Sequence, residues 1–253
     1  GDLMVYVDFM SVLHKSTKRD YLARVNDTDY PKAKSAKLGK QWSYDYWDGD
    51  RRINYGGYYY MEGRWEKVAR AMVDYYNLPK APKILDIGCG KAPLSSSIFH
   101  GITDLVEYDN EEGEQLINDG NTCSNLEDNS FDFVYSSHCL EHMDDPYVSF
   151  GHWVRVCKSG GVIFVSVPHE IFYEKCLWPS RYAPHYSSWT LEWESDLPKS
   201  VNVNKFIEKF EKEGSVEKIL AETVLENFSF RDFYSDQTLG LGICQIDFVV
   251  RKK

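Results

Sequence analysis

Two glycines follow a short apolar run that contains an acid, and together these residues could hold a ligand against the backbone. Residues 84–87 lead into Gly88-Cys89-Gly90, and a helix-compatible segment follows from about Pro93. Glycine has no Cβ and tolerates positive φ, so such a turn lets a ligand approach backbone N–H groups. The alternative is a plain tight turn between a strand and a helix, and the two glycines alone do not decide between them.

Acids stand where three of the predicted strands end, at Asp86, Asp109 and Asp119. Ligands of an open parallel sheet bind beyond the carboxyl ends of its strands. Asp109 follows the glycine turn by about 20 residues, which is the spacing of an acid that binds ribose hydroxyls. The pattern therefore indicates a cofactor that contains a nucleoside, and it leaves NAD and S-adenosylmethionine both open.

The elements that must position these residues alternate between strands and helices. Helical periodicity predicts helices over 63–77, 94–99, 146–157 and 203–212, with helical character also at 32–40. Short apolar runs predict strands over 84–87, 105–109, 115–118, 131–136, 162–167, 224–233 and 242–250. We expect the glycines of 158–161 to end the preceding helix, and we expect irregular structure over 168–200. This order predicts an α/β fold with a Rossmann-like, mostly parallel sheet of seven strands and an antiparallel terminal hairpin.

The first 62 residues differ in composition from the rest, so we expect an N-terminal extension over 1–62 and one domain over 63–253. Residues 15–40 hold eight Lys and Arg against three acids, and 42–60 are dense in aromatic residues and glycine. An aromatic segment of this kind suits a lid that stacks on a flat ligand, or a latch packed on the main domain. The basic residues could help to hold a phosphorylated substrate, or form a solvated face.

Composition excludes several classes of protein. Hydrophobic residues make up 43% and aromatic residues 15% of the chain, which excludes a disordered chain. A net charge of −10 argues against nucleic acid as the main partner, since phosphates repel an acidic protein. The six cysteines form no Cys-x-x-Cys pair, which is typical of reduced thiols, and no apolar run approaches the roughly 18–20 residues of a membrane span. We expect a cytoplasmic protein; whether residues precede Gly1 in the native chain stays open.

Three segments together resemble the successive motifs of class I S-adenosylmethionine-dependent methyltransferases. They are residues 84–90, residues 128–142 and residues 158–168, and the resemblance extends over about 64–253. The dinucleotide fingerprint requires a third glycine where this chain has Pro93, which counts against NAD. The resemblance therefore implies S-adenosylmethionine as the cofactor. Lys91-Ala92-Pro93 departs from the small or glycine-rich continuation that is common in the family.

Carried over by position, the resemblance implies a cofactor site made of ten residues. It assigns Asp86, Gly88 and Gly90 to the methionine and ribose, Asp109 to the ribose hydroxyls, Asp119 to the adenine edge with Gly120 and Asn121 beside it, Ser136 and Ser137 to the floor beneath the sulfonium, and Arg64 to the cofactor carboxylate.

The front of the chain resembles a bacterial subgroup of these enzymes that is linked to sugar modification in surface polysaccharides. The residues that carry this second resemblance lie at 18–25, 46–52, 55–58 and 63–65. It implies O-methylation of a sugar or sugar nucleotide, in capsule or lipopolysaccharide synthesis. The alternatives are an N-methyltransferase for a small molecule such as an amino-sugar, and a cofactor-binding subunit without catalysis. A homodimer is an open alternative to a monomer.

A sugar hydroxyl is a poor nucleophile, so a positioned base would accelerate its methylation by about 10²–10⁴-fold. Three candidates follow the fifth predicted strand, at His169, Glu170 and His185. His185 is favoured because the segment 178–189 resembles one of the subgroup that has a histidine in this place. His169 is the second candidate, and Glu170 could orient either ring.

Residues 138–142 also match the His-x-x-Glu-His pattern of a class of zinc proteases. That pattern requires a helix that presents both histidines and a third ligand downstream. Here it follows a predicted strand inside the methyltransferase motifs. We therefore expect no metal, and we expect His142 to be structural or close to the cofactor.

Overall fold

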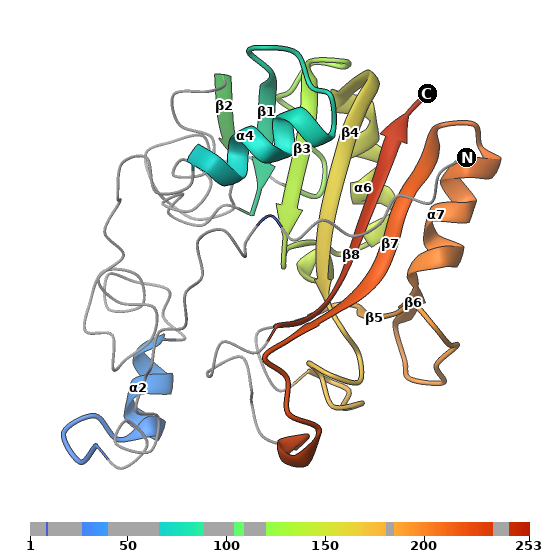
Figure 1. Ribbon diagram of the computed structural model, residues 1–253. Coiled ribbons are helices and arrows are strands. Elements are labelled where there is room, and N and C mark those ends of the chain that lie inside the picture. Colours follow the sequence, from blue (N-terminus) through green and yellow to red (C-terminus); the bar gives the residue numbers. More distant parts are fainter. Residues whose placement is uncertain are drawn as a thin grey trace.

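The computed structural model describes Phe9 and residues 27–39, 66–88, 104–108, 120–180, 185–234 and 243–253 (Figure 1). Several predicted features lie outside these residues: Arg64, Gly90, Asp109, Asp119, the boundary at 62, the helix 94–99, the strand 115–118 and the aromatic segment 42–60. Within the predicted extension, a helix α2 is present at Lys32–Gly39. No helix among the described residues has the length and hydrophobicity needed to cross a bilayer.

The described strands form one main sheet in the order β2-β1-β3-β4-β8-β7. The first four are parallel, and β8 runs antiparallel to both of its neighbours. Their bounds are β1 Lys83–Ile87, β2 Asp104–Tyr108, β3 Phe131–Ser137, β4 Cys157–Pro168, β7 Val216–Glu226 and β8 Ile243–Lys252. The mostly parallel sheet and the terminal hairpin are confirmed. The described residues supply six of the seven predicted strands, and the seventh, 115–118, lies outside them.

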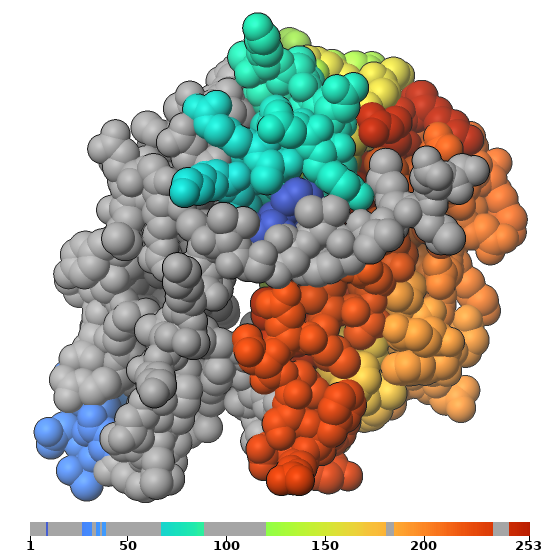
Figure 2. Space-filling view, in the orientation of Figure 1, coloured from blue at the N-terminus to red at the C-terminus, as the bar shows by residue number. Residues whose placement is uncertain are grey.

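Helices cover both faces of this sheet (Figure 1). Helix α4, Glu66–Tyr75, packs on the face that includes Ile84 and Phe133. Neighbouring residues of a strand point to opposite faces, so Leu85 and Val134 face the other core, with α6 Pro146–Val156 and α7 Val203–Lys212. Figure 2 shows α4 and the C-terminal segments exposed on the same side of the molecule.

Local capping explains why α6 and α7 match their predictions within one residue. The Asp145 side chain accepts hydrogen bonds from the backbone N–H groups of Tyr147 and Val148, and Pro146 opens the helix. Asn202 accepts from the N–H of Lys205 at the start of α7. Both caps are short-range features, so the sequence alone is enough to locate them.

Three predictions about elements are wrong. The strand predicted at 224–233 is β7, which begins at Val216 because it pairs with β8 along its whole length. Three aromatic residues in the later part of the predicted range instead contact Phe172; they are Phe228, Phe230 and Phe233. The segment 168–200 is not wholly irregular, since β5 Ser188–Thr190 pairs with β6 Ser200–Asn202.

The third correction concerns the predicted glycine stop at 158–161. Helix α6 ends before it, and Cys157 already pairs with Phe131. The next residue of β4 in register is Val162, which faces Phe133, so residues 158–161 bulge out of the strand. Gly160 has a φ of 79°, which suits the sharp bend of such a bulge.

Asp247 carries a buried carboxylate in the middle of β8, and its titration should be visible in the stability of the protein. Ser166 Oγ and Gln245 Nε2 donate to its Oδ1 at 2.6 and 2.7 Å, but burial dominates and raises the pKa to about 6. Because the folded pKa exceeds the unfolded one, the folded state binds the proton more tightly. The resulting stabilisation is complete below about pH 4 and is lost as the pH rises through about 6.

We therefore expect Asp247→Asn to stabilise the protein above pH 7 by up to about 3 kcal/mol, because the isosteric amide still accepts both hydrogen bonds and carries no charge. Urea unfolding of both proteins between pH 4.5 and 7.5 measures the difference. The gain should shrink toward zero at the acid end. An equal gain at every pH would contradict the raised pKa.

Candidate active site

The turn after β1 accepts no side chain at Gly88. Its φ is 81°, and a Cβ built there would lie 2.5 Å from the Cβ and 2.6 Å from the Sγ of Cys139. Asp86, two residues earlier, is buried. The spacing of the glycines predicts that a ligand approaches this turn closely. The structure adds that the turn is packed against the segment that follows β3.

Gly120 and Asn121, predicted to lie beside the adenine, are held by packing against α6. The carbonyl of Gly120 accepts from Trp153 Nε1 at 2.9 Å. Asn121 Oδ1 accepts from the N–H of Asp144 at 3.0 Å and from Ser149 Oγ at 3.3 Å. These bonds fix the backbone next to Asp119, and they occupy the side-chain oxygen of Asn121.

The two serines at the end of β3 differ in their surroundings. Ser136 pairs with Ile87 of β1 and is fully buried, and its Oγ has no hydrogen-bond partner within the described residues. Ser137, the last residue of β3, is partly exposed. A buried hydroxyl without a partner is a natural contact for a ligand at the floor of the site.

His169 is placed as a structural residue. Its Nδ1 accepts from the backbone N–H groups of Ile171 and Phe172 at 3.1 and 3.4 Å, and the ring packs between Phe172 and Trp193. Burial lowers its pKa, while nearby Glu192, 3.6 Å from Nε2, acts in the opposite direction. Since Nδ1 already accepts two bonds, the remaining ring nitrogen carries the hydrogen and is not available as a base.

Glu170 is bound to serines. Its Oε2 accepts from Ser188 Oγ at 2.8 Å and from Ser200 Oγ at 2.5 Å. It thus links β5 to β6 and orients neither histidine through a hydrogen bond.

His185 is oriented by a different acid, Glu174. Its Nδ1 hydrogen-bonds to Glu174 Oε1, and the other carboxylate oxygen accepts from Ser180 Oγ at 2.7 Å. A carboxylate only accepts, so Nδ1 carries the hydrogen and Nε2 presents its lone pair. Sequence reasoning missed Glu174, because an acid in an irregular segment carries no signal of which histidine it faces.

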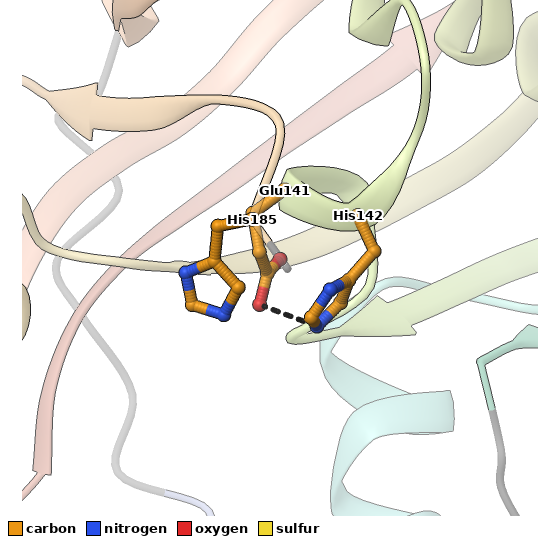
Figure 3. A group of neighbouring side chains, drawn as sticks. All are labelled: Glu141, His142 and His185. Carbon is orange, nitrogen blue, oxygen red and sulfur yellow. Dashed lines mark ion pairs between the residues drawn. The ribbon is translucent and has the colours of Figure 1, made fainter. Parts of the chain in front are cut away.

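A second group follows β3, around the buried Glu141. Neither of its carboxylate oxygens has a hydrogen-bond partner within the described residues, and burial raises its pKa well above the usual value. Oε1 lies 3.7 Å from His142 Nε2 and 3.8 Å from His138 Nδ1. Figure 3 shows the Glu141 carboxylate between the rings of His142 and His185.

Backbone hydrogen bonds join these groups into one site. The carbonyl of Glu141 accepts from the N–H of Tyr186 at 2.7 Å, and the N–H of His138 donates to the carbonyl of Ser166 in β4 at 2.9 Å. The two groups follow the carboxyl ends of the neighbouring parallel strands β3 and β4. In an open α/β sheet, this edge binds ligands.

The sequence from β1 to β4 matches a known family. A family model described as "Methyltransferase domain" matches residues 85–165, which include the glycine turn, Ser136 and the turn 138–142. No curated protein sequence matches the chain.

Solved structures share the fold of this chain at low sequence identity. An S-adenosylmethionine-dependent methyltransferase from Clostridium acetobutylicum is 15% identical over 74% of this chain and 90% of its own, with a TM-score of 0.50. A protein from Galdieria sulphuraria described as a sarcosine dimethylglycine methyltransferase is 13% identical over 74% and 85%, with a TM-score of 0.51. A protein from Bacillus halodurans described as a methyltransferase is 13% identical over 73% and 96%, with a TM-score of 0.50. These structures confirm the predicted methyltransferase fold.

Proposed function

We propose that the chain is an S-adenosylmethionine-dependent O-methyltransferase that acts on a hydroxyl of a sugar or sugar nucleotide. The observation that carries the proposal is the Glu174–His185 pair, which presents a ring nitrogen at the ligand-binding edge of the methyltransferase domain. The sugar acceptor and the place of the reaction in surface-polysaccharide synthesis are supported by the resemblance of the front of the chain to the bacterial subgroup. A cytoplasmic location is supported by the scattered cysteines, which are typical of reduced thiols.

The described residues at this edge fit the proposed cofactor. Gly88 keeps the turn after β1 free of a side chain, and Asp86 is buried two residues earlier on β1. The buried hydroxyl of Ser136 has no hydrogen-bond partner among the described residues and could bond to the cofactor. S-adenosylmethionine supplies an electrophilic methyl group with a neutral thioether as the leaving group. The protein must therefore align the acceptor oxygen with that methyl group, which can be worth about 7–11 kcal/mol.

The acceptor hydroxyl must also lose its proton, and His185 can accept that proton. As the oxygen forms its bond to the methyl carbon, the hydroxyl proton moves to Nε2 of His185. The ring is then a cation held by the carboxylate of Glu174, which also keeps the ring in the required tautomer. The imidazolium releases the proton to solvent after the product leaves.

Calorimetric titration with S-adenosylhomocysteine, with NAD as the comparison ligand, tests the cofactor. We expect binding of the first only, and a large loss of affinity in Gly88→Ala, because the new Cβ collides with Cys139 and deforms the turn. Gly214→Ala is the matched control: its φ is 77°, but nothing lies within 4 Å of the added Cβ. It carries the backbone strain without the collision and should bind normally.

Circular dichroism of both variants shows whether Gly88→Ala is folded, and a folded variant without affinity supports the proposal. Absence of binding to the unmodified protein would refute the methyltransferase mechanism. If Gly88→Ala is folded and binds as well as Gly214→Ala, the turn after β1 is not the cofactor site.

A further inference from the structure

The groups at the carboxyl ends of β3 and β4 present several acceptor atoms to one another. His185 contributes Nε2, because its Nδ1–H is bound by Glu174. A histidine held this way by a carboxylate is the usual arrangement of a metal-binding imidazole, whose tautomer and direction are set by the second partner.

Glu141 contributes a carboxylate for which the described protein offers no donor. It is fully buried, and neither oxygen accepts a hydrogen bond from a described residue. A buried, unpaired carboxylate is costly unless a cation or a proton compensates for it. The side chains nearest to this carboxylate include the imidazole rings of His138 and His142, which could share a cation with it.

His138 faces the same carboxylate with a lone pair as well. Gln245 Nε2 donates to Asp247 Oδ1 at 2.7 Å, so Gln245 presents its carbonyl oxygen to His138 Nε2, at 3.1 Å. The hydrogen of neutral His138 is therefore on Nε2, and Nδ1 faces Glu141 Oε1 as an acceptor at 3.8 Å. Two acceptors at this separation favour a positive charge between or beside them.

The separations of the ligand atoms suit one ion. One atom each of Glu141, His142 and His185 lies within 4.8 Å of the others, and Glu141 Oε1 is 3.7 Å from His142 Nε2. Ligands about 2.1 Å from a shared ion lie roughly 3–4 Å from one another. Small side-chain rotations are enough to close the site, and Figure 3 shows the three side chains directed toward one another.

We propose that Glu141, His142 and His185 bind a divalent transition-metal ion. Two imidazoles and one carboxylate suit zinc, manganese, iron or cobalt, and leave coordination positions open. From the sequence we expect no metal, because the pattern at 138–142 follows a predicted strand and does not fit a protease helix. The structure places His142 in a short 3₁₀ turn, Leu140–His142, and supplies the missing third ligand from the segment after β4.

The ion's role, unlike its binding, rests on the proposed function. An acceptor hydroxyl that coordinates the ion loses its proton more readily, to a solvent water, as its oxygen forms the bond to the methyl carbon. In the metal-bound enzyme His185 is then a ligand rather than the base. Neighbouring hydroxyls of a sugar could chelate such an ion, which would select for that class of acceptor.

The test is titration of the chelator-treated full chain with Mn²⁺, Zn²⁺ and Co²⁺ by calorimetry, with the visible spectrum of bound Co²⁺ as the second readout. We expect one site per chain, lost in Glu141→Gln and in His142→Gln. Glu174→Gln should weaken binding by about 10–100-fold, because it removes the partner that orients His185. His152→Gln, a histidine of α6 outside the cluster, is the matched control and should bind normally.

The outcomes separate this inference from the proposed function when S-adenosylhomocysteine is titrated into the same preparations. Metal binding that survives in both Glu141→Gln and His142→Gln, or no saturable binding at all, overturns the metal site. If these proteins still bind S-adenosylhomocysteine, the methyltransferase proposal stands without the ion. If the unmodified protein binds metal but not S-adenosylhomocysteine, the metal site is supported and the proposed function is refuted.

Discussion

His185→Gln lowers kcat/KM for methyl transfer to a hydroxyl acceptor by about 10²–10⁴-fold, the usual contribution of a positioned base. Glutamine retains much of the size and polarity of the ring but cannot accept the proton. Affinity for S-adenosylhomocysteine should change little, since His185 lies after β4 and the predicted cofactor turn after β1. Initial rates and calorimetry on the same preparations measure the two effects separately.

Glu174→Gln should reduce the same rate by a smaller factor, because an amide can still bond to the ring but does not stabilise the imidazolium. Its pH–rate profile should also shift, which a purely structural change would not cause. His152→Gln is again the matched control and should leave both rate and profile unchanged.

Assays of His185→Gln with amine as well as hydroxyl acceptors could contradict the role of His185 as a base. A variant that is as active as the unmodified enzyme on an amine acceptor would favour the N-methyltransferase hypothesis, because an amine needs no strong base. Loss of activity on chelation, restored by metal, would assign His185 to the ion instead of to the proton.

Trp153→Ala lowers the free energy of unfolding by about 3–5 kcal/mol, the range for removing a large buried aromatic side chain. Trp153 is fully buried in α6, packs against Phe150, and donates from Nε1 to the carbonyl of Gly120. Its loss leaves a cavity beneath the sheet and frees the backbone beside the predicted adenine site. Urea unfolding with Val148→Ala as a control, at an exposed position of the same helix, measures the effect.

Trp153→Phe separates packing from the hydrogen bond. It retains most of the apolar contact but leaves the buried carbonyl of Gly120 without its indole donor, which should cost about 1–3 kcal/mol. A Trp153→Ala variant no less stable than Val148→Ala would contradict the placement of this side chain in the core.

The sequence alone was sufficient for features that depend on neighbouring residues. Helices α6 and α7 were predicted within one residue because their caps and apolar faces are local. The turn at Gly88 was predicted because a glycine that ends a short buried strand readily adopts the positive φ of a tight turn. The terminal hairpin was predicted as such, but the start of β7 was not, since pairing with β8 over its whole length decides where β7 begins.

In the candidate site, too, the sequence predicts some features and only the tertiary structure decides others. Parallel topology places everything after β3 and β4 at one edge of the sheet, so the sequence could predict the neighbourhood of His169, Glu170 and His185. It could not predict which side chains turn toward one another there. Packing directs His169 to backbone N–H groups and Glu170 to two serines, and it brings Glu174 to His185. The meeting of Glu141, His142 and His185 joins two distant segments, and only the tertiary structure decides such contacts because they depend on side-chain direction across strands.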